Sequence, residues 1–345
     1  MNKYPDKISD TGTLEDLLSL PTEASVNMCS DLEGDIMFLG IGGKIGPSLA
    51  RMTRRACDKA KVKKRIYGVS LFESDEARKQ IEDMGIETFH GDLLDRDFIK
   101  RLPKAKNVFF LAGMKFGSEE NISLTWAVNS YMPALVAEHF KESNIVAFST
   151  GCVYPLVSLE SGGSLEADPP APTGEYAQSC LGRERMFEYG SKKYQTRVCL
   201  IRLNYSVELR YGVLLDIATK VKNREAIDLS MGHFNVIWQG DMNDVVMRSL
   251  EICDSPPKVL NITGEEILSV REVALEFGKL LHKRPVFVGE EAPTALLNNA
   301  SEAFQLFGRP KVSTQQIIKW IAYWISEGRE TLGKPTHYEV RDGKY

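Results

Sequence analysis

The sequence is poor in the features that mark secreted, membrane-spanning or metal-binding proteins. Its five histidines lie far apart, so no metal-binding cluster is expected. No apolar run approaches the roughly 20 residues that cross a bilayer, and the first residues lack the apolar core of a signal peptide. The cysteines form no CxxC pair, which is typical of reduced thiols in a cytoplasmic protein. They are Cys29, Cys57, Cys152, Cys180, Cys199 and Cys253.

An excess of positive charge is also missing. With 43 Lys and Arg against 47 Asp and Glu, the formal net charge is −4. The overall charge therefore does not favour binding to nucleic acid or to an anionic membrane, and we expect neither as a partner. What is present is an ordinary globular composition, 43% apolar and 26% charged, over 345 residues. That length fits two domains, or one large domain with an added end.

Residues 1–34 are polar apart from one short amphipathic segment. Its Leu14, Leu17 and Leu18 fall on one face of a helix, and Pro21 would end that helix. We expect a helical extension packed on the surface, and a partner-binding role is the alternative.

From residue 35 onward, short apolar runs alternate with segments of helical period. Such alternation predicts a parallel, doubly wound sheet with helices on both faces. We expect strands at 35–43, 65–71, 87–95, 107–113, 144–150 and 197–203, and helices at 47–60, 77–85, 96–103, 124–143 and around Tyr176. After about residue 205 the pattern loosens, with short strands at 225–232 and 234–239 and helices at 241–253, 270–281 and 313–333.

The segment GIGGKIG places Gly40, Gly43 and Gly46 between a predicted strand and a predicted helix. Glycine at such a turn lets a pyrophosphate approach the backbone N–H groups of the helix N-terminus. A tight packing turn is the alternative for the glycines alone, but inside a βαβ unit the array favours a dinucleotide. We therefore predict an α/β fold, a Rossmann-type doubly wound parallel sheet with a smaller C-terminal α/β region. Its parts are an N-terminal extension (1–34), a dinucleotide-binding domain (35–205) and the C-terminal region (206–345).

The end of the second predicted strand should distinguish NAD from NADP. An acidic residue there would bind the ribose 2′-hydroxyl of NAD, but Ser70 stands at this place. Without the acid a 2′-phosphate is not repelled, and nearby arginines, namely Arg51, Arg54, Arg55 and Arg78, are candidates to meet one. The cofactor is NAD or NADP, with NAD as the first choice.

Further motifs follow the glycine loop in order: HGDLLD, FLAGMKFGSEEN, AVNSYMPALV, FSTGCVYP, EYAQSC and IRLNYSV. In this order they resemble the extended short-chain dehydrogenase/reductase superfamily, of the NAD-dependent epimerase/dehydratase type, over nearly all of residues 35–330. The resemblance implies cofactor contacts at Gly40, Gly43, Lys44, Ile45, Gly46, Ser70, Asp92, Leu93, Leu111, Ala112, Gly113, Lys115, Asn129, Tyr176 and Cys180. It implies that the C-terminal region binds the substrate, with substrate contacts at Thr150, Cys152, Arg202, Asn204 and His233.

The resemblance also implies catalytic roles. Tyr176 would act as general acid or base, Thr150 would orient the reacting oxygen, and Asn129 would steady the site. The family places a Lys four residues after the Tyr, where it lowers the Tyr pKa and holds the nicotinamide ribose. Here that residue is Cys180, and a thiol performs neither task well.

Three explanations of Cys180 stay open. In the first, another cation substitutes, with Lys115 as the main candidate and Lys44 and Arg183 as others. In the second, the protein binds a dinucleotide without catalysis, as a sensor or partner protein. In the third, Cys180 or Cys152 takes part in different chemistry.

The expected function is that of an NAD(P)-dependent epimerase, dehydratase or reductase acting on a sugar, sugar acid or nucleotide sugar. The alternative is a non-catalytic dinucleotide-binding protein. By analogy with the family, we expect a homodimer that forms through helices at 123–141 and 176–190.

Overall fold

A seven-stranded parallel sheet forms the base of the protein. The computed structural model describes residues 4–115 and 117–344. The strand order is β12-β7-β5-β4-β1-β2-β3, and every neighbouring pair is parallel. The expected Rossmann-type α/β fold is thus confirmed. The strands are β1 (Ile36–Leu39), β2 (Ile66–Ser70), β3 (Glu87–His90), β4 (Asn107–Phe110), β5 (Asn144–Thr150), β7 (Arg197–Leu203) and β12 (Lys258–Ile262).

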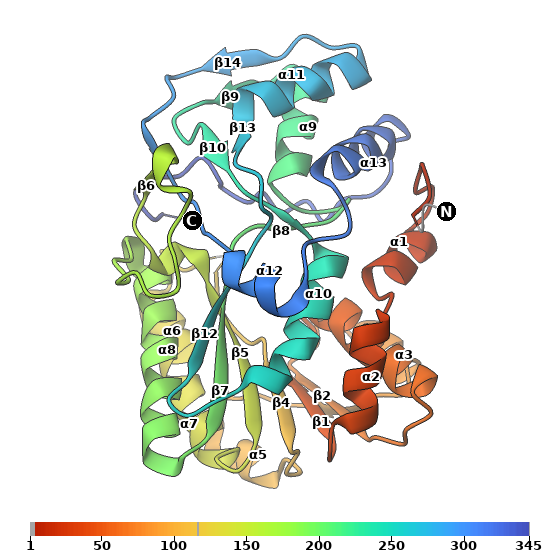
Figure 1. The fold of residues 1–345 in the computed structure, drawn as a ribbon, viewed down its shortest axis with the longest axis vertical. Coiled ribbons are helices and arrows are strands. Elements are labelled where there is room, and N and C mark those ends of the chain that lie inside the picture. The colour runs from red at the N-terminus through yellow and green to blue at the C-terminus, as the bar shows by residue number, and fades with distance from the viewer. Residues whose placement is uncertain (1–3, 116, 345) are drawn as a thin grey trace.

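Both faces of this sheet are covered because its central strands are apolar on both sides. Along β1, Ile36 and Phe38 pack into one hydrophobic cluster, and Met37 and Leu39 into another on the opposite face. Figure 1 shows helices on the two sides of the strands. These helices are α2 (Glu23–Asp31), α3 (Gly46–Lys59), α4 (Asp75–Glu82), α5 (Arg96–Arg101), α6 (Ile122–Trp126), α7 (Met132–His139), α8 (Gly174–Tyr194) and α10 (Gln239–Arg248).

The region expected as one helix over 124–143 is interrupted. Between α6 and α7 the backbone makes a π-helical turn, Ala127–Tyr131, that contains Asn129. Such turns are rare and often occur at functional sites. Here the wider turn contains Asn129, whose side chain hydrogen-bonds to Met114 in the loop after β4.

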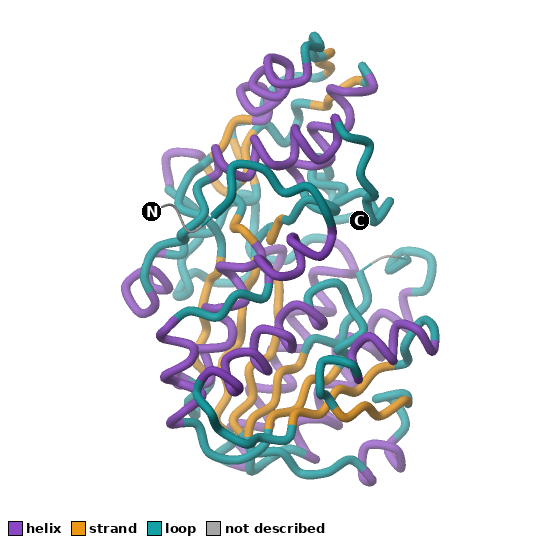
Figure 2. The backbone as a smooth tube through the Cα atoms, turned by 90° about the vertical axis from the view of Figure 1, so that its right-hand side faces the viewer, coloured by secondary structure: helices purple, strands orange, loops and turns teal. Residues whose placement is uncertain are grey.

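The smaller C-terminal region stacks above the carboxyl ends of the strands (Figure 2). It contains α9 (Val213–Asn223), α11 (Val270–Leu281), α12 (Ser301–Phe307) and α13 (Thr314–Ser326). Its short strands are β8 (Ser206–Val207), β9 (Ala226–Asp228), β10 (His233–Phe234), β11 (Ile237–Trp238), β13 (Leu268–Ser269), β14 (Val286–Val288) and β15 (Thr294–Ala295), of which β15 pairs with β6 (Val157–Ser158). This region is not separate in space, because its β12 returns to pair with β7 in the main sheet.

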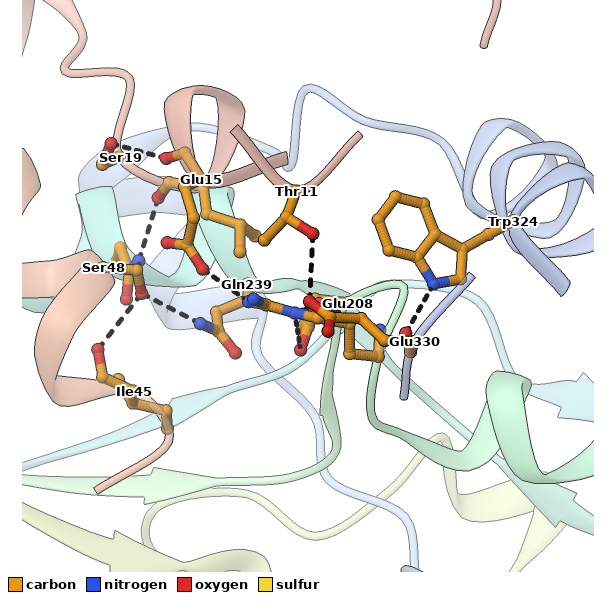
Figure 3. A network of polar contacts seen from close by, with 12 residues as sticks. Thr11, Glu15, Ser19, Ile45, Ser48, Glu208, Gln239, Trp324 and Glu330 are labelled. Atoms are coloured by element: carbon orange, nitrogen blue, oxygen red, sulfur yellow. Dashed lines mark hydrogen bonds and ion pairs between the residues drawn. The ribbon is translucent and has the colours of Figure 1, made fainter. Parts of the chain in front are cut away.

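The N-terminal extension joins these two parts. Its α1 (Thr11–Leu18) buries Leu14 and Leu18 completely in the core of the C-terminal region. Figure 3 shows its polar contacts, among them a hydrogen bond from Thr11 to Glu330. In the same network Gln239 of α10 donates to Ser48 of α3 at 2.9 Å.

The C-terminal segment, residues 329–344, runs back across the molecule. Its Leu332 N–H donates to the Arg210 carbonyl at 3.0 Å. Further along, Arg341 donates to the Thr294 carbonyl at 2.7 Å. Near its end, Gly343 packs against the start of α8, where a Cβ on Gly174 would lie 2.3 Å from the Gly343 oxygen. The segment therefore bridges the C-terminal region and the N-terminus of α8. Within the described residues, every helix is too short or too polar to cross a membrane.

Candidate functional site

The glycine loop connects β1 to α3 at the carboxyl edge of the sheet. Gly40 has φ +87°, and a Cβ there would lie 2.6 Å from the Ala112 nitrogen. A Cβ on Gly46 would lie 2.0 Å from the Ile41 oxygen. Gly43 is different, because a Cβ there would meet only the Gly40 oxygen, at 3.5 Å. Packing thus requires glycine at two of the three positions, and the open space at Gly43 fits the close approach of a ligand to the helix N-terminus.

The adjoining strand ends place the other predicted cofactor contacts beside this loop. Ser70 ends β2, and its Oγ lies 2.6 Å from where a Cβ on Gly42 would be. The Gly91 N–H donates to the Ser70 carbonyl at 3.2 Å, which brings the start of the HGDLLD loop alongside. There Asp92 is exposed and Leu93 is buried. The residues present fit an adenosine dinucleotide laid across these strand ends.

Asn129 holds the loop that follows β4. Its Nδ2 donates to the Met114 carbonyl at 2.8 Å, and its Oδ1 accepts from the Met114 N–H at 2.9 Å. Asn129 is fully buried and also donates to Ser179 of α8 at 3.0 Å. The loop after Leu111 and Ala112 is thereby fixed against α8 at Met114. A Cβ on the preceding Gly113 would lie 2.6 Å from Arg183 Nη2 of α8.

Thr150, Tyr176 and Cys180 come together at the end of β5. The Thr150 and Cys180 side chains both lie close enough to Tyr176 to interact with it. Burial raises the pKa of Tyr176 well above its usual value, and the Cys180 and Cys152 thiols act in the same direction. The Arg183 guanidinium and the Thr150 side chain oppose this rise. Burial also raises the pKa of the Cys180 thiol to about 11, so that thiol is neutral at neutral pH.

One lysine lies beside this cluster, and a second lysine lies near the first. Lys115 donates to the Thr336 carbonyl of the C-terminal segment at 3.1 Å. Burial lowers its pKa, while Cys152, Asp216 and Cys180 act in the opposite direction, so Lys115 lies near both thiols. Lys44, beside Ile45, turns toward β8 and donates to the Ser206 carbonyl at 3.2 Å. Burial lowers the pKa of Lys44 to about 8.

The predicted substrate contacts are not all gathered at Tyr176. Cys152 lies near Tyr176, because its thiol acts to raise the pKa of Tyr176. Asn204 is buried and donates to Asn235 at 2.8 Å. Arg202 forms a buried ion pair with Glu184 at 2.8 Å. His233 lies in β10 of the C-terminal region, paired with β13.

The sequence did not indicate the contact of Lys115 with Thr336. The two residues are 221 positions apart, and no motif surrounds Thr336. Asp216 fixes this part of the segment by accepting from the Thr336 N–H at 2.8 Å and from its hydroxyl at 2.6 Å. Within the described residues, no group of His, Cys, Asp and Glu forms a metal-ion site.

A parallel sheet wound in two directions, with a glycine loop after its first strand, defines an α/β protein of the Rossmann type. The model of the NAD dependent epimerase/dehydratase family matches residues 36–211, and the chain belongs to that family. No curated protein sequence matches it.

Solved structures share this fold at low sequence identity. The Thermus thermophilus UDP-glucose 4-epimerase in complex with NAD is 18% identical with a TM-score of 0.68, over 84% of this chain and 98% of its own. The Bacillus cereus UDP-glucuronic acid 4-epimerase, solved with NAD, is 16% identical with a TM-score of 0.70, over 85% and 99%. The Streptomyces venezuelae dTDP-glucose 4,6-dehydratase, solved with NAD, is 17% identical with a TM-score of 0.70, over 85% and 97%.

Proposed function

We propose that this protein is an NAD-dependent epimerase, dehydratase or reductase that acts on a sugar, sugar acid or nucleotide sugar. The observation that carries the proposal is the proximity of Thr150 and Tyr176 at the carboxyl end of β5, where the Thr150 side chain acts to lower the pKa of Tyr176. This proximity brings two hydroxyl groups together beside the loop that Asn129 fixes, at the edge of the sheet where Rossmann-type proteins bind their ligands. Similar solved structures contain NAD and act on UDP- or dTDP-sugars.

Each residue of the site would have a separate role in the reaction. A bound nicotinamide would accept and return a hydride. Tyr176 removes a proton from a substrate hydroxyl, or returns one, and Thr150 holds the reacting oxygen in line. Lys115, which lies near the Cys152 and Cys180 thiols, would hold the nicotinamide ribose in place of the missing Lys. The substrate side is provided by Asn204, at the end of the dinucleotide-binding domain, and by the loops of the C-terminal region near His233.

NAD is favoured over NADP by the contacts of the nearby arginines. Arg51 pairs with Asp16 of the N-terminal extension at 2.6 Å, and Arg55 donates to the Asp16 carbonyl at 2.9 Å. Arg78 pairs with Glu82 at 3.0 Å. These guanidinium groups are engaged by other residues of the chain, whereas a 2′-phosphate would need a guanidinium beside Ser70.

The first test identifies the bound nucleotide and then the turnover. Protein purified without added cofactor is denatured, and any released nucleotide is identified by mass spectrometry and absorbance. Released NAD supports an enzyme that regenerates its cofactor within each cycle. The protein is then incubated with NAD and UDP-glucose, UDP-glucuronic acid or dTDP-glucose, and the sugars are followed by NMR.

The Tyr176→Phe variant separates this proposal from a non-catalytic binding protein. We expect it to bind NAD as the parent does and to lose about 10²- to 10⁴-fold in turnover, because only the proton transfer is removed. If the parent binds NAD but converts no sugar, including other sugar and sugar-acid substrates, the non-catalytic alternative stands.

A further inference from the structure

Helix α8 directs a buried guanidinium toward the Tyr176 cluster. Tyr176, Cys180 and Arg183 are spaced by four and three residues, so they follow one face of the helix. Tyr176 is partly exposed, whereas Cys180 is 0% and Arg183 5% exposed, so the arginine lies on the buried side of the cluster.

Arg183 is held by neutral oxygens. It donates to the Phe148 carbonyl at 2.7 Å and to Asn129 Oδ1 at 2.6 Å. Its guanidinium lies 5.7 Å from the centre of the Phe110 ring. Its Nε is buried without a hydrogen-bond partner among the described residues.

No carboxylate of the described residues forms a salt bridge with Arg183. The adjacent Glu184 is paired with Arg202 instead. A desolvated cation without a counter-ion is costly. That cost falls when a negative charge appears nearby, so this arrangement favours an anion in the cluster.

The groups that act on Tyr176 show where this anion forms. They are the Cys180 thiol and the Arg183 guanidinium from α8, and the Thr150 hydroxyl and Cys152 thiol from the end of β5. Lys115 lies near the Cys152 and Cys180 thiols. Arg183 acts to lower the pKa of both Tyr176 and Cys180. Cys180 has no role in the proposed proton transfer, whereas Tyr176 carries it out, so the anion forms on Tyr176.

We propose that Arg183 is the cation that stabilises negative charge on the Tyr176 oxygen, as a positioning residue that touches neither substrate nor cofactor. This inference rests on the proposed function of Tyr176. It would then divide the two tasks of the missing Lys: Arg183 lowers the pKa of the phenol from the buried side, and Lys115 holds the nicotinamide ribose. It also explains why a neutral Cys180 is tolerated, since a second cation one turn from Arg183 would be repelled.

The test is a titration of Tyr176 in the full chain by ¹⁹F NMR. The 12 tyrosines are replaced biosynthetically with 3-fluorotyrosine, which lowers the phenol pKa, and the Tyr176 signal is assigned by its loss in Tyr176→Phe. We expect Arg183→Met to raise the apparent pKa of Tyr176 by about one unit or more, and Arg183→Lys to restore most of the difference. Lys115→Met is the matched control, because it removes the other nearby cation, and it should shift this pKa less. An unchanged Tyr176 pKa in Arg183→Met overturns the proposal.

A second variant covers the case in which Arg183→Met does not fold. Arg183→Gln removes the charge but keeps an amide that can donate to the Phe148 carbonyl or to Asn129 Oδ1. It should raise the apparent pKa of Tyr176 by about one unit or more, as Arg183→Met would. An unchanged Tyr176 pKa in Arg183→Gln overturns the proposal. Neither measurement uses a sugar, so a failure here does not count against the proposed function, and a failure of turnover leaves the charge coupling intact.

Discussion

At the scale of single residues, the buried ion pair of Arg202 and Glu184 depends on the presence of both partners. Arg202 donates to both carboxylate oxygens of Glu184, at 3.0 and 2.8 Å, and to the Tyr154 hydroxyl at 2.7 Å. Ser149 also donates to Glu184, at 2.5 Å. Glu184→Gln should destabilise the protein by about 3–5 kcal/mol in urea unfolding, because the Arg202 charge stays buried and unpaired. The double variant Glu184→Leu/Arg202→Met removes both charges and should cost less; an equal or larger loss would contradict this account.

Asp241 should give the folding stability a distinct pH dependence. Burial raises its pKa from 3.8 to about 6, although the N–H groups of Lys311 and Val312, each 2.9 Å away, oppose the rise. Because the folded pKa is the higher one, Asp241 supports folding when protonated, and this support is lost as the pH rises from about 4 to about 6. The pKa difference corresponds to on the order of 3 kcal/mol. Asp241→Asn, which stays neutral, should therefore gain that much relative to the parent between pH 4 and 7 in urea titrations, and parallel curves would refute the assignment.

At the scale of elements, the glycine loop allows packing and ligand binding to be tested separately. Gly43→Ala adds a methyl group in open space and should leave the thermal midpoint unchanged or slightly higher. The same methyl group would keep a pyrophosphate from the backbone, so we expect NAD affinity, measured by calorimetry, to fall about tenfold or more. Gly40→Ala is the matched variant, with φ +87° and a collision with Ala112, and should cost about 2 kcal/mol or more of stability. If the Gly43→Ala protein binds NAD as the parent does, the glycine loop does not contact the cofactor.

The elements also show what a sequence can predict. The sheet strands β1, β2, β4, β5 and β7 were predictable because each is a short apolar run followed by turn residues, and α11 begins and ends as its period indicates, whereas the short β6 was not predicted. The return of β12 to the main sheet was not, since pairing between residues 258–262 and 199–203 depends on the whole fold. The closing helix was predicted over 313–333 but ends at Ser326. The chain then continues as the C-terminal segment, which accepts a hydrogen bond from Lys115. In the site, Thr150 and Tyr176 came from motifs, while the partners of Lys115 and Arg183 are set by tertiary contacts.

At the scale of the whole molecule, the two chain ends connect the sheet to the C-terminal region. Glu15 of α1 pairs with Arg210 at 2.6 Å, and Leu18 offers its carbonyl to Asn243 of α10 at 3.0 Å. At the other end, the Trp320 indole donates to the Pro5 carbonyl at 2.9 Å. As expected, the extension packs as a helix on the surface, with Leu14 and Leu18 on its buried face. Its polar contacts connect it with the glycine loop, α10 and the C-terminal segment (Figure 3).

A homodimer remains our proposal for the assembly, through the outer surface of α6, α7 and α8. Large apolar side chains are exposed there, namely Ile122, Leu124, Trp126, Tyr131 and Tyr189. Leu124→Asp should convert the dimer to a monomer in sedimentation analysis, because a carboxylate in the centre of an apolar interface is costly. The matched control is Leu275→Asp on α11, in the C-terminal region, whose side chain is similarly exposed, 45% against 40% for Leu124. Only the first substitution should change the mass at micromolar protein. If the parent protein sediments as a monomer, this surface faces solvent and the proposal is wrong.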